Sequence, residues 1–329
     1  MKTKFLVFAD LHVDIMHDSV KRMEQILAAA KEKKVDYIIH LGDVMYPEAD
    51  YVRRHAPQDF ERRGEAWFLC ERDGEKAAIR QMLNDSGLKV YGVLGNHDMD
   101  ACDKSTACRY WNMPAPHYTF TEGGVRFIAL DSQFIRTEDG DEDFAYCNYR
   151  HSPWQQLHFI PDEQLEWLEK TLFASKEPCV LLSHAALGDD QLCVQNRDRV
   201  WDIVRRANEN GRRVIAAFNG HNHADGVTMR CGVPFISINS ASNLWMGETW
   251  RTTRFSQQIS QDYPHIGCTA PYRDALYAVI TITDEELAME GVTSEYVGLS
   301  PQQVGLPRQM YCHEPVPMTR SRRFELRRK

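Results

Sequence analysis

The feature that most constrains this chain is an apolar segment that stops abruptly at four residues with metal or proton chemistry. Residues 90–94 are mostly apolar, and Gly95, Asn96, His97 and Asp98 follow at once. Such a change is typical of a buried strand whose end reaches the edge of an open α/β sheet, where ligands bind. Asn96 offers an amide oxygen, His97 a titratable imidazole, and Asp98 a carboxylate that could orient this imidazole. A polar turn would show the same pattern, so other segments of the chain are needed to distinguish a ligand-binding site from a turn.

Four further apolar segments also end in residues that can bind a divalent metal. Their ends carry Asp10 and His12 after residues 4–9, Asp43 after 35–41, His184 after 178–183, and His221 and His223 after 213–218. Parallel strands place their carboxyl ends on one edge of a sheet, so we expect these side chains to converge.

With Asn96 they supply two carboxylates, one amide oxygen and four imidazoles. That is too many ligands for one tetrahedral zinc and fits two metals sharing a bridging carboxylate. Because nitrogen and oxygen ligands occur without thiolate, the set favours Mn, Fe, Zn or Co over copper or iron–sulfur.

Helical periodicity alternates with these strands and predicts an α/β fold. The apolar stripe of Met23, Ile26, Leu27 and Ala30 predicts a helix over residues 18–33. Further helices are expected over residues 75–83, 161–173 and 198–208, hairpins over 118–130 and 227–239, and a last strand over 275–283. Residues 45–85 exceed an ordinary crossover and are expected to form a cap insertion. We therefore predict one domain over residues 1–283 and a C-terminal extension over 284–329.

Composition limits the classes of protein that the chain can belong to. Of its 329 residues, 43% are hydrophobic and 26% charged, which is ordinary for a soluble globular protein. No apolar run approaches the roughly 18 residues of a membrane span, so no membrane partner is expected. The nine cysteines include no CxxC pair, which favours reduced thiols and a cytoplasmic location. Cys102 and Cys108 could pair or bind zinc, but their spacing is weak support.

The formal net charge is −8, which argues against a protein that coats nucleic acid. It leaves room for a phosphate-bearing substrate, because a metal site supplies its own positive charge. The last ten residues run the other way, with six basic side chains and one acidic. They fit a solvated or loosely packed tail, and alternatively a contact with an anionic partner.

The motifs together resemble one known family. In order, they are Asp10-Leu11-His12, Gly42-Asp43, Gly95-Asn96-His97-Asp98, His184, and Gly220-His221-Asn222-His223. This order is similar to that of the calcineurin-like metallophosphoesterases, and the match spans residues 5–240. The resemblance implies a four-layer α/β/β/α sandwich of two mixed sheets. It also implies a binuclear centre of divalent or trivalent metal ions, and hydrolysis of a phosphoester in which a hydroxide shared by both metals attacks phosphorus.

Roles carried over residue by residue follow from the same resemblance. It implies that Asp10, His12 and His223 hold the first metal. It implies that Asn96, His184 and His221 hold the second, and that Asp43 bridges both. His97 would be the proton donor or transition-state ligand, and Asp98 would orient it.

Departures from the family pattern limit the classes of substrate that we expect. The segment after Gly42-Asp43 lacks the GDxxDRG motif of the family's protein phosphatases. Tyr46 matches the tyrosine ligand of purple acid phosphatases, but His12 makes such a ligand unnecessary, so we expect Tyr46 to pack. The layout looks most similar to the cyclic-nucleotide phosphodiesterase and nucleotide-diphosphatase branches, which implies a small phosphodiester or nucleotide. A phosphomonoesterase, a nuclease on the same metal core, and a binding protein that lost the chemistry are the alternatives.

Side chains outside the motifs have two interpretations. Some aromatic residues could stack a nucleobase or pack a small cap: Tyr46, Trp67, Tyr110, Trp111, Trp245 and Trp250. Arg53, Arg54, Arg62 and Arg63 could meet phosphate or lie on a solvated helix face.

Overall fold

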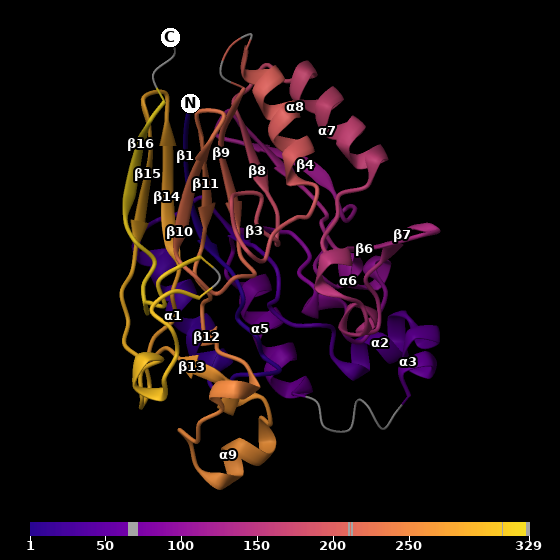
Figure 1. Cartoon of the computed structure of the whole chain (residues 1–329), viewed down its shortest axis with the longest axis vertical. Helices are drawn as coiled ribbons and strands as arrows, with labels where there is room; N and C mark the ends of the chain where they lie inside the picture. Colours follow the sequence, from indigo (N-terminus) through magenta and orange to yellow (C-terminus); the bar gives the residue numbers. More distant parts are fainter. Residues whose placement is uncertain (65–71, 210, 212, 311, 327–329) are drawn as a thin grey trace.

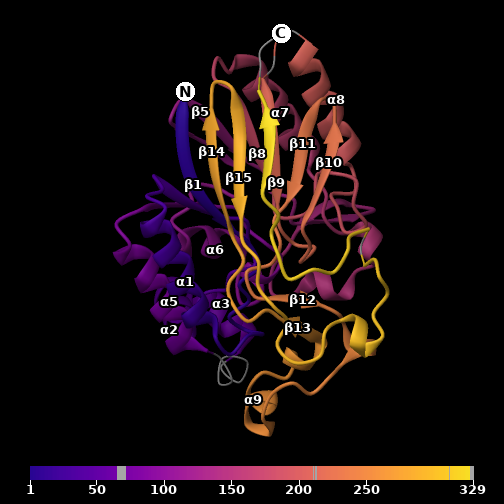
Figure 2. The same cartoon turned by 90° about the vertical axis from the view of Figure 1, so that its left-hand side faces the viewer.

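The predicted four-layer sandwich is confirmed in the structure, a computed structural model that describes residues 1–64, 72–209, 211, 213–310 and 312–326. Two mixed six-stranded sheets pack face to face, and helices cover their outer faces (Figures 1 and 2). Phe5 of the first sheet meets Phe127 and Phe218 of the second edge to face, with ring centroids 5.4 and 6.2 Å apart. The main apolar core therefore lies between the sheets.

The first sheet has the strand order β16-β15-β14-β1-β2-β3. In chain order its strands are β1 (Lys2–Phe8), β2 (Tyr37–His40), β3 (Lys89–Gly92), β14 (Ala278–Thr283), β15 (Glu286–Gly291) and β16 (Arg322–Glu325). The strands β1, β2 and β3 are parallel, as their alternation with helices predicts, and β14 pairs antiparallel with β1. The carboxyl ends of β1, β2 and β3 thus share one edge.

The second sheet has the order β10-β11-β9-β8-β5-β4. Its strands are β4 (Tyr118–Glu122), β5 (Val125–Ala129), β8 (Cys179–Leu182), β9 (Val214–Asn219), β10 (Gly226–Arg230) and β11 (Val233–Ser237). Strand β8 lies parallel between β5 and β9, and the predicted hairpins form the antiparallel pairs β4–β5 and β10–β11.

The four predicted amphipathic helices are present and cover the sheets. They are α1 (Ser19–Glu32), α5 (Asp73–Asp85), α7 (Asp162–Ala174) and α8 (Arg197–Glu209). Leu168 of α7 and Val204 of α8 are fully buried in one apolar cluster with Leu181 of β8, so this helix pair packs on the second sheet. Met23 of α1 and Ile79 of α5 join the core with the first sheet.

Shorter elements gather at the ends of the strands. They are α2 (Ala49–His55), α3 (Pro57–Arg63), α6 (Lys104–Tyr110), the β6–β7 hairpin (Phe134–Thr137, Gly140–Asp143), the β12–β13 ladder (Asn243–Trp245, Thr269–Pro271), α9 (Gln257–Asp262), and the 3₁₀ turns η1 (His97–Met99), η2 (Asn148–His151), η3 (Trp154–Gln156), η4 (Glu248–Trp250), η5 (Ile266–Cys268) and η6 (Gln302–Val304). The ladder and α9 form a lobe at the lower end of both views (Figures 1 and 2).

The expected cap segment, residues 45–85, contributes α2, α3 and α5. Its residues 65–71, which include Trp67, lie outside the described residues. Tyr46, Val52 and Ala56 form an apolar cluster with Ala101, so α2 packs beside the segment that follows β3. The cap role stays a prediction.

The C-terminal segment is part of the first sheet rather than loosely attached. Strands β15 and β16 extend that sheet, and Arg323 pairs with Glu286. Arg320 and Arg322 both bond the carboxylate of Asp225, which is 4% exposed and lies two residues after His223. Residues 320–326 of the basic tail are therefore bound within the chain. None of the described helices combines the length and apolar character needed to cross a bilayer.

Candidate metal centre

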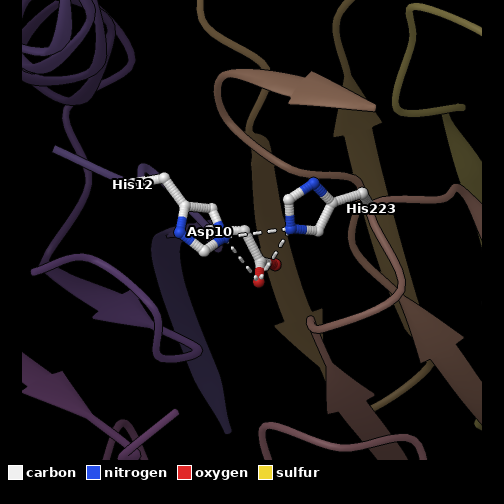
Figure 3. Close-up of side chains that lie close together, drawn as sticks. All are labelled: Asp10, His12 and His223. Atoms are coloured by element: carbon white, nitrogen blue, oxygen red, sulfur yellow. Dashed lines mark hydrogen bonds and ion pairs between the residues drawn. The ribbon is translucent and has the colours of Figure 1, made fainter. Parts of the chain in front are cut away.

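The seven side chains predicted as metal ligands come together at the carboxyl ends of the strands, and we call them the ligand rim. In one half of the rim, Asp10, His12 and His223 converge (Figure 3). The Nε2 atoms of His12 and His223 lie 3.0 Å apart, and Oδ1 of Asp10 lies 3.5 Å from Nε2 of His223. These are the three residues assigned to the first metal.

The other half of the rim surrounds Nε2 of His184. This atom lies 3.1 Å from Nδ1 of His221 and 3.3 Å from Oδ1 of Asn96. Oδ2 of Asp43 lies 3.2 Å from the same atom and 3.9 Å from Nε2 of His12 in the first half. The carboxylate of Asp43 thus stands between the two halves, as a bridging ligand must.

Five of the seven rim residues have a left-handed backbone. The φ angles are 55° at Asp10, 52° at His12, 51° at Asp43, 69° at His221 and 49° at His223. A left-handed conformation costs an L-residue about 1–2 kcal/mol, so the surrounding structure must hold these turns in place. Backbone hydrogen bonds do so, since Asp10 N–H donates to the Gly42 carbonyl and His12 N–H to the Asp43 carbonyl, at 3.0 and 3.1 Å.

Two motif glycines allow the second and third strand ends to touch. A Cβ on Gly42, whose φ is 89°, would lie 2.5 Å from the Gly95 nitrogen. A Cβ on Gly95 would lie 2.2 Å from Oδ1 of Asp43. A side chain at Gly42 would therefore clash with Gly95 and His184, and one at Gly95 would displace Asp43 from the rim.

Two imidazoles are oriented by backbone carbonyls outside the rim. Nδ1 of His184 lies 2.7 Å from the Leu41 oxygen, and Nδ1 of His223 lies 2.8 Å from the Asn243 oxygen. Each Nδ1–H donates to its carbonyl and leaves the Nε2 lone pair facing the rim, which is the usual arrangement for a metal-binding histidine.

The donor set of the rim fits metal ions. Burial raises the pKa of Asp43, but His184 and His97 outweigh this effect and hold the pKa well below its ordinary value. Burial and the imidazole of His158 lower the pKa of His221. Burial also lowers the pKa of His184, but the charge of Asp43 raises it to about 9, so a cation binding there displaces a proton. An ionised carboxylate and imidazoles that face one another at about hydrogen-bond distance are well suited to divalent cations.

His97 is oriented by Asp100 and not by Asp98, which differs from the expectation. Nδ1 of His97 lies 3.0 Å from Oδ2 of Asp100, and the hydroxyl of Tyr149 and the guanidinium of Arg150 donate to the same carboxylate at 2.8 and 2.7 Å. Successive residues of the 3₁₀ turn η1 diverge, whereas residues three apart lie on one side, so residue 100 meets His97. Burial lowers the pKa of His97, but Asp100 and Asp43 outweigh it and raise the pKa to about 10.

Asp98 instead holds the second strand end against the third. Its carboxylate accepts N–H groups from Gly95 at 2.7 Å, Asp43 at 3.1 Å, Val44 at 3.2 Å and Met45 at 3.3 Å. It thereby fixes the turn that carries Asp43.

A cavity of about 380 Å³ opens beside the rim. Its lining includes five rim residues and His97, and beyond them Asp14, Ile15, Tyr149, Arg150, Leu192, Asn222, Trp245, Glu248 and His265. We call Trp245, Glu248 and His265 the outer wall. None of the described residues in the segment 45–85 lines the cavity. The outer wall comes instead from the lobe that contains the β12–β13 ladder and α9 (Figure 1).

Of the residues that line the cavity beyond the rim and His97, the sequence analysis considered only Trp245 as a possible substrate contact. Tyr110 and Trp111 are buried, and Trp250 packs in the lobe, so these aromatic side chains pack as the alternative interpretation held. Tyr46 is also buried, 4% exposed, and joins the α2 cluster. The sequence offered only one weak sign that Asp14, Tyr149 and Arg150 line the cavity. They are ionisable or aromatic residues in stretches without helix or strand periodicity.

Comparison with known proteins agrees with this geometry. The family model described as calcineurin-like phosphoesterase matches residues 3–225. A dimetal phosphatase from Danio rerio is similar in structure, with a TM-score of 0.59 and 15% identity over 91% of this chain and 99% of that one. GAP50, the anchor in the inner membrane complex of Plasmodium, is similar with a TM-score of 0.50 and 11% identity over 91% and 89%. At these identities the structural likeness shows the fold alone. No curated protein sequence matches the chain.

Proposed function

The chain belongs to the calcineurin-like phosphoesterase family and is a metal-dependent phosphoric ester hydrolase, and we propose that its substrate is a small phosphodiester or nucleotide-type molecule. The observation that carries this proposal is the extent of the cavity beyond the ligand rim. Its volume of about 380 Å³ is within the roughly 300–1,000 Å³ of small-molecule sites, and far exceeds what one phosphoryl group occupies. An organic group on the second ester oxygen would fill the remaining space.

The rim residues would hold the two cations that the family implies. We assign Asp10, His12 and His223 to one cation and Asn96, His184 and His221 to the other, with Asp43 shared. Their distances support this assignment. When bound, two such cations supply a nucleophile at neutral pH and neutralise charge on the phosphoryl oxygens. The donor set fits Mn, Fe or Zn.

His97 would supply the proton for the leaving oxygen. The neighbouring carboxylates raise its pKa to about 10, so the imidazole carries a proton at neutral pH. Asp100 holds Nδ1, which leaves Nε2 to give a proton to a group in the cavity. Transfer of this kind contributes about 10²–10⁴-fold to a rate.

Two cavity residues support a substrate larger than a phosphomonoester. Arg150 lines the cavity while its Nη2 bonds Asp100 and its Nε bonds Tyr149, so Nη1 can meet a phosphate oxygen. Trp245 in the outer wall offers an aromatic face on which a nucleobase could stack. The eight described cysteines are free thiols, which supports a cytoplasmic location as part of this proposal.

The test compares two chromogenic substrates on the protein loaded with Mn²⁺. We expect bis-p-nitrophenyl phosphate to be hydrolysed with a higher kcat/KM than p-nitrophenyl phosphate, and elemental analysis to find two metals per chain. Faster hydrolysis of the monoester would overturn the proposed substrate class. Faster cleavage of single-stranded DNA than of either small ester would favour a nuclease instead.

A further inference from the structure

A second group of metal-binding side chains lies in the outer wall, apart from the ligand rim. One ligand atom each from Glu248, His265 and Cys268 lies within 4.8 Å of the others. The thiol of Cys268 is buried and donates to Oε1 of Glu248, with sulfur and oxygen 3.2 Å apart. Glu248 and His265 line the catalytic cavity, so this group faces the same space as the rim.

The backbone brings the three side chains together in advance. His265 precedes the 3₁₀ turn η5 and Cys268 ends it, and residues three apart in such a turn lie on one side. Glu248 begins the turn η4, which is tied to η5 because the N–H groups of Met246 and Gly247 donate to the Cys268 carbonyl at 2.8 and 3.1 Å. The β12–β13 ladder fixes the chain on both sides. Little ordering would remain for a metal to impose.

We propose that Glu248, His265 and Cys268 form a third cation site, which takes Zn²⁺ and controls access to the catalytic cavity. One thiolate, one imidazole and one carboxylate are ligands that zinc prefers, and three protein ligands leave one position open. The ligand rim contains no thiolate, so the two kinds of site differ in chemistry. The site itself does not depend on the proposed function, whereas control of access does.

Cation binding at this site requires Cys268 to lose its proton and Glu248 to give up part of its ion pair with Arg251. Burial and the neighbouring Glu248 raise the pKa of Cys268 to about 11, so the thiol releases its proton to solvent when it binds the cation. Arg251 donates to both oxygens of Glu248, at 2.7 and 2.6 Å, and must give up part of this contact. Both side chains of this ion pair are exposed. Exposed ion pairs are weak, so Arg251 is a modest competitor for the cation.

The decisive measurement is the near-ultraviolet absorption of cobalt bound to a thiolate. The full chain is first loaded with Mn²⁺ and then titrated with Co²⁺, which replaces Zn²⁺ as the probe. Cobalt that exchanges into the rim gives no thiolate band, because the rim has only nitrogen and oxygen ligands. We expect a band that saturates at one thiolate-bound cobalt per chain.

Three variants make the assignment specific. Cys268→Ser should abolish the band, and His265→Gln should weaken binding if the serine variant does not fold. Arg251→Gln should tighten cobalt binding by about two- to fivefold, because it removes the competitor for Glu248. Cys231→Ser, at an exposed thiol, is the matched control and should keep the band.

Absence of the band from the unaltered protein, or its survival in Cys268→Ser, would overturn the site. Control of access has its own test on the Mn²⁺-loaded protein with bis-p-nitrophenyl phosphate. We expect micromolar Zn²⁺ to inhibit the unaltered protein more strongly than Cys268→Ser. Equal inhibition of the two would overturn the regulatory role, whereas a lack of hydrolysis without zinc would count against the proposed function and leave the spectroscopic result intact.

Discussion

The ligand rim and the outer wall face the same cavity but are built in different ways. The rim residues follow parallel strands, and left-handed turns cross-linked by backbone hydrogen bonds hold five of them. The outer wall comes from short 3₁₀ turns and a two-stranded ladder in a separate lobe. The two meet where His223 donates to the Asn243 carbonyl at the start of β12. We therefore expect the rim to carry the metal chemistry and the outer wall to contact the substrate.

The largest expected effect comes from breaking the rim at its centre. Asp43→Ala removes the carboxylate shared by both halves, so we expect elemental analysis to find fewer than two metals. Activity should fall by more than the roughly 10–100-fold that residues outside the first coordination shell cost. Asp50→Ala, at an exposed aspartate on α2, is the control. Retention of both metals by the Asp43 variant would contradict the bridging role.

Loss of the proton donor should separate metal binding from turnover. In His97→Ala we expect both metals to remain and kcat to fall by about 10²–10⁴-fold, as general acid groups contribute. Stopped assays and elemental analysis on the same preparation measure the two quantities. A parallel loss of metal would instead make His97 a ligand.

Two neighbouring carboxylates can be told apart by the pH dependence of kcat. Asp100 raises the pKa of His97, so Asp100→Asn should move the alkaline limb of the profile to lower pH and reduce kcat by about 10–100-fold. Asp98→Asn weakens the turn that carries Asp43 but should leave the limb in place. The reverse result would return the orienting role to Asp98.

The outer wall should respond through substrate binding. Trp245→Ala removes the aromatic face, so KM for a nucleotide-type substrate should rise by about tenfold, because stacking is worth about 1–3 kcal/mol per base. We expect kcat and metal content to stay the same. If kcat falls and KM does not, Trp245 supports the rim rather than the substrate.

The smallest expected effect is the contribution of His40 to the pH dependence of the free energy of unfolding. His40 is buried beside Trp111, and burial and His184 lower its pKa from 6.5 to about 3. Between these values the unfolded chain binds a proton that the folded chain does not, so stability falls as pH falls. This one group contributes a slope of about 1.4 kcal/mol per pH unit. Urea unfolding of metal-free protein should show a shallower slope for His40→Leu than for the unaltered chain.

Sequence patterns were sufficient for an α/β fold and for the convergence of the rim, whereas the four-layer sandwich was implied by the family resemblance. Apolar strands, helical stripes and the polar residues directly after each strand are local signals, and the parallel arrangement of strands turns them into one site. The partner of His97 was not accessible in this way, because it depends on the 3₁₀ geometry of η1. Asp98 is adjacent to His97 in the sequence and Asp100 lies three residues away, so proximity along the chain favours the wrong carboxylate.

The outer wall and the C-terminal strands depended on contacts that no local pattern carries. Trp245, Glu248 and His265 lie in a stretch without periodicity, and the ladder that positions them joins residues 243–245 to 269–271. Similarly, the sequence of the short strand β16 is basic and is typical of a solvated tail. Its place in the fold depends on pairing with β15 and on the ion pairs of Arg320 and Arg322 with Asp225.

The ion pairs of Arg320 and Arg322 with Asp225 also determine which end of the chain can carry a fused tag. The amino terminus pairs with an exposed Asp284, and an affinity tag there would disturb this weak surface contact. A tag or fluorescent fusion that pulled β16 away would strip a buried carboxylate of both guanidinium partners two residues from His223. Handles for purification or imaging therefore belong at the first residue, not the last.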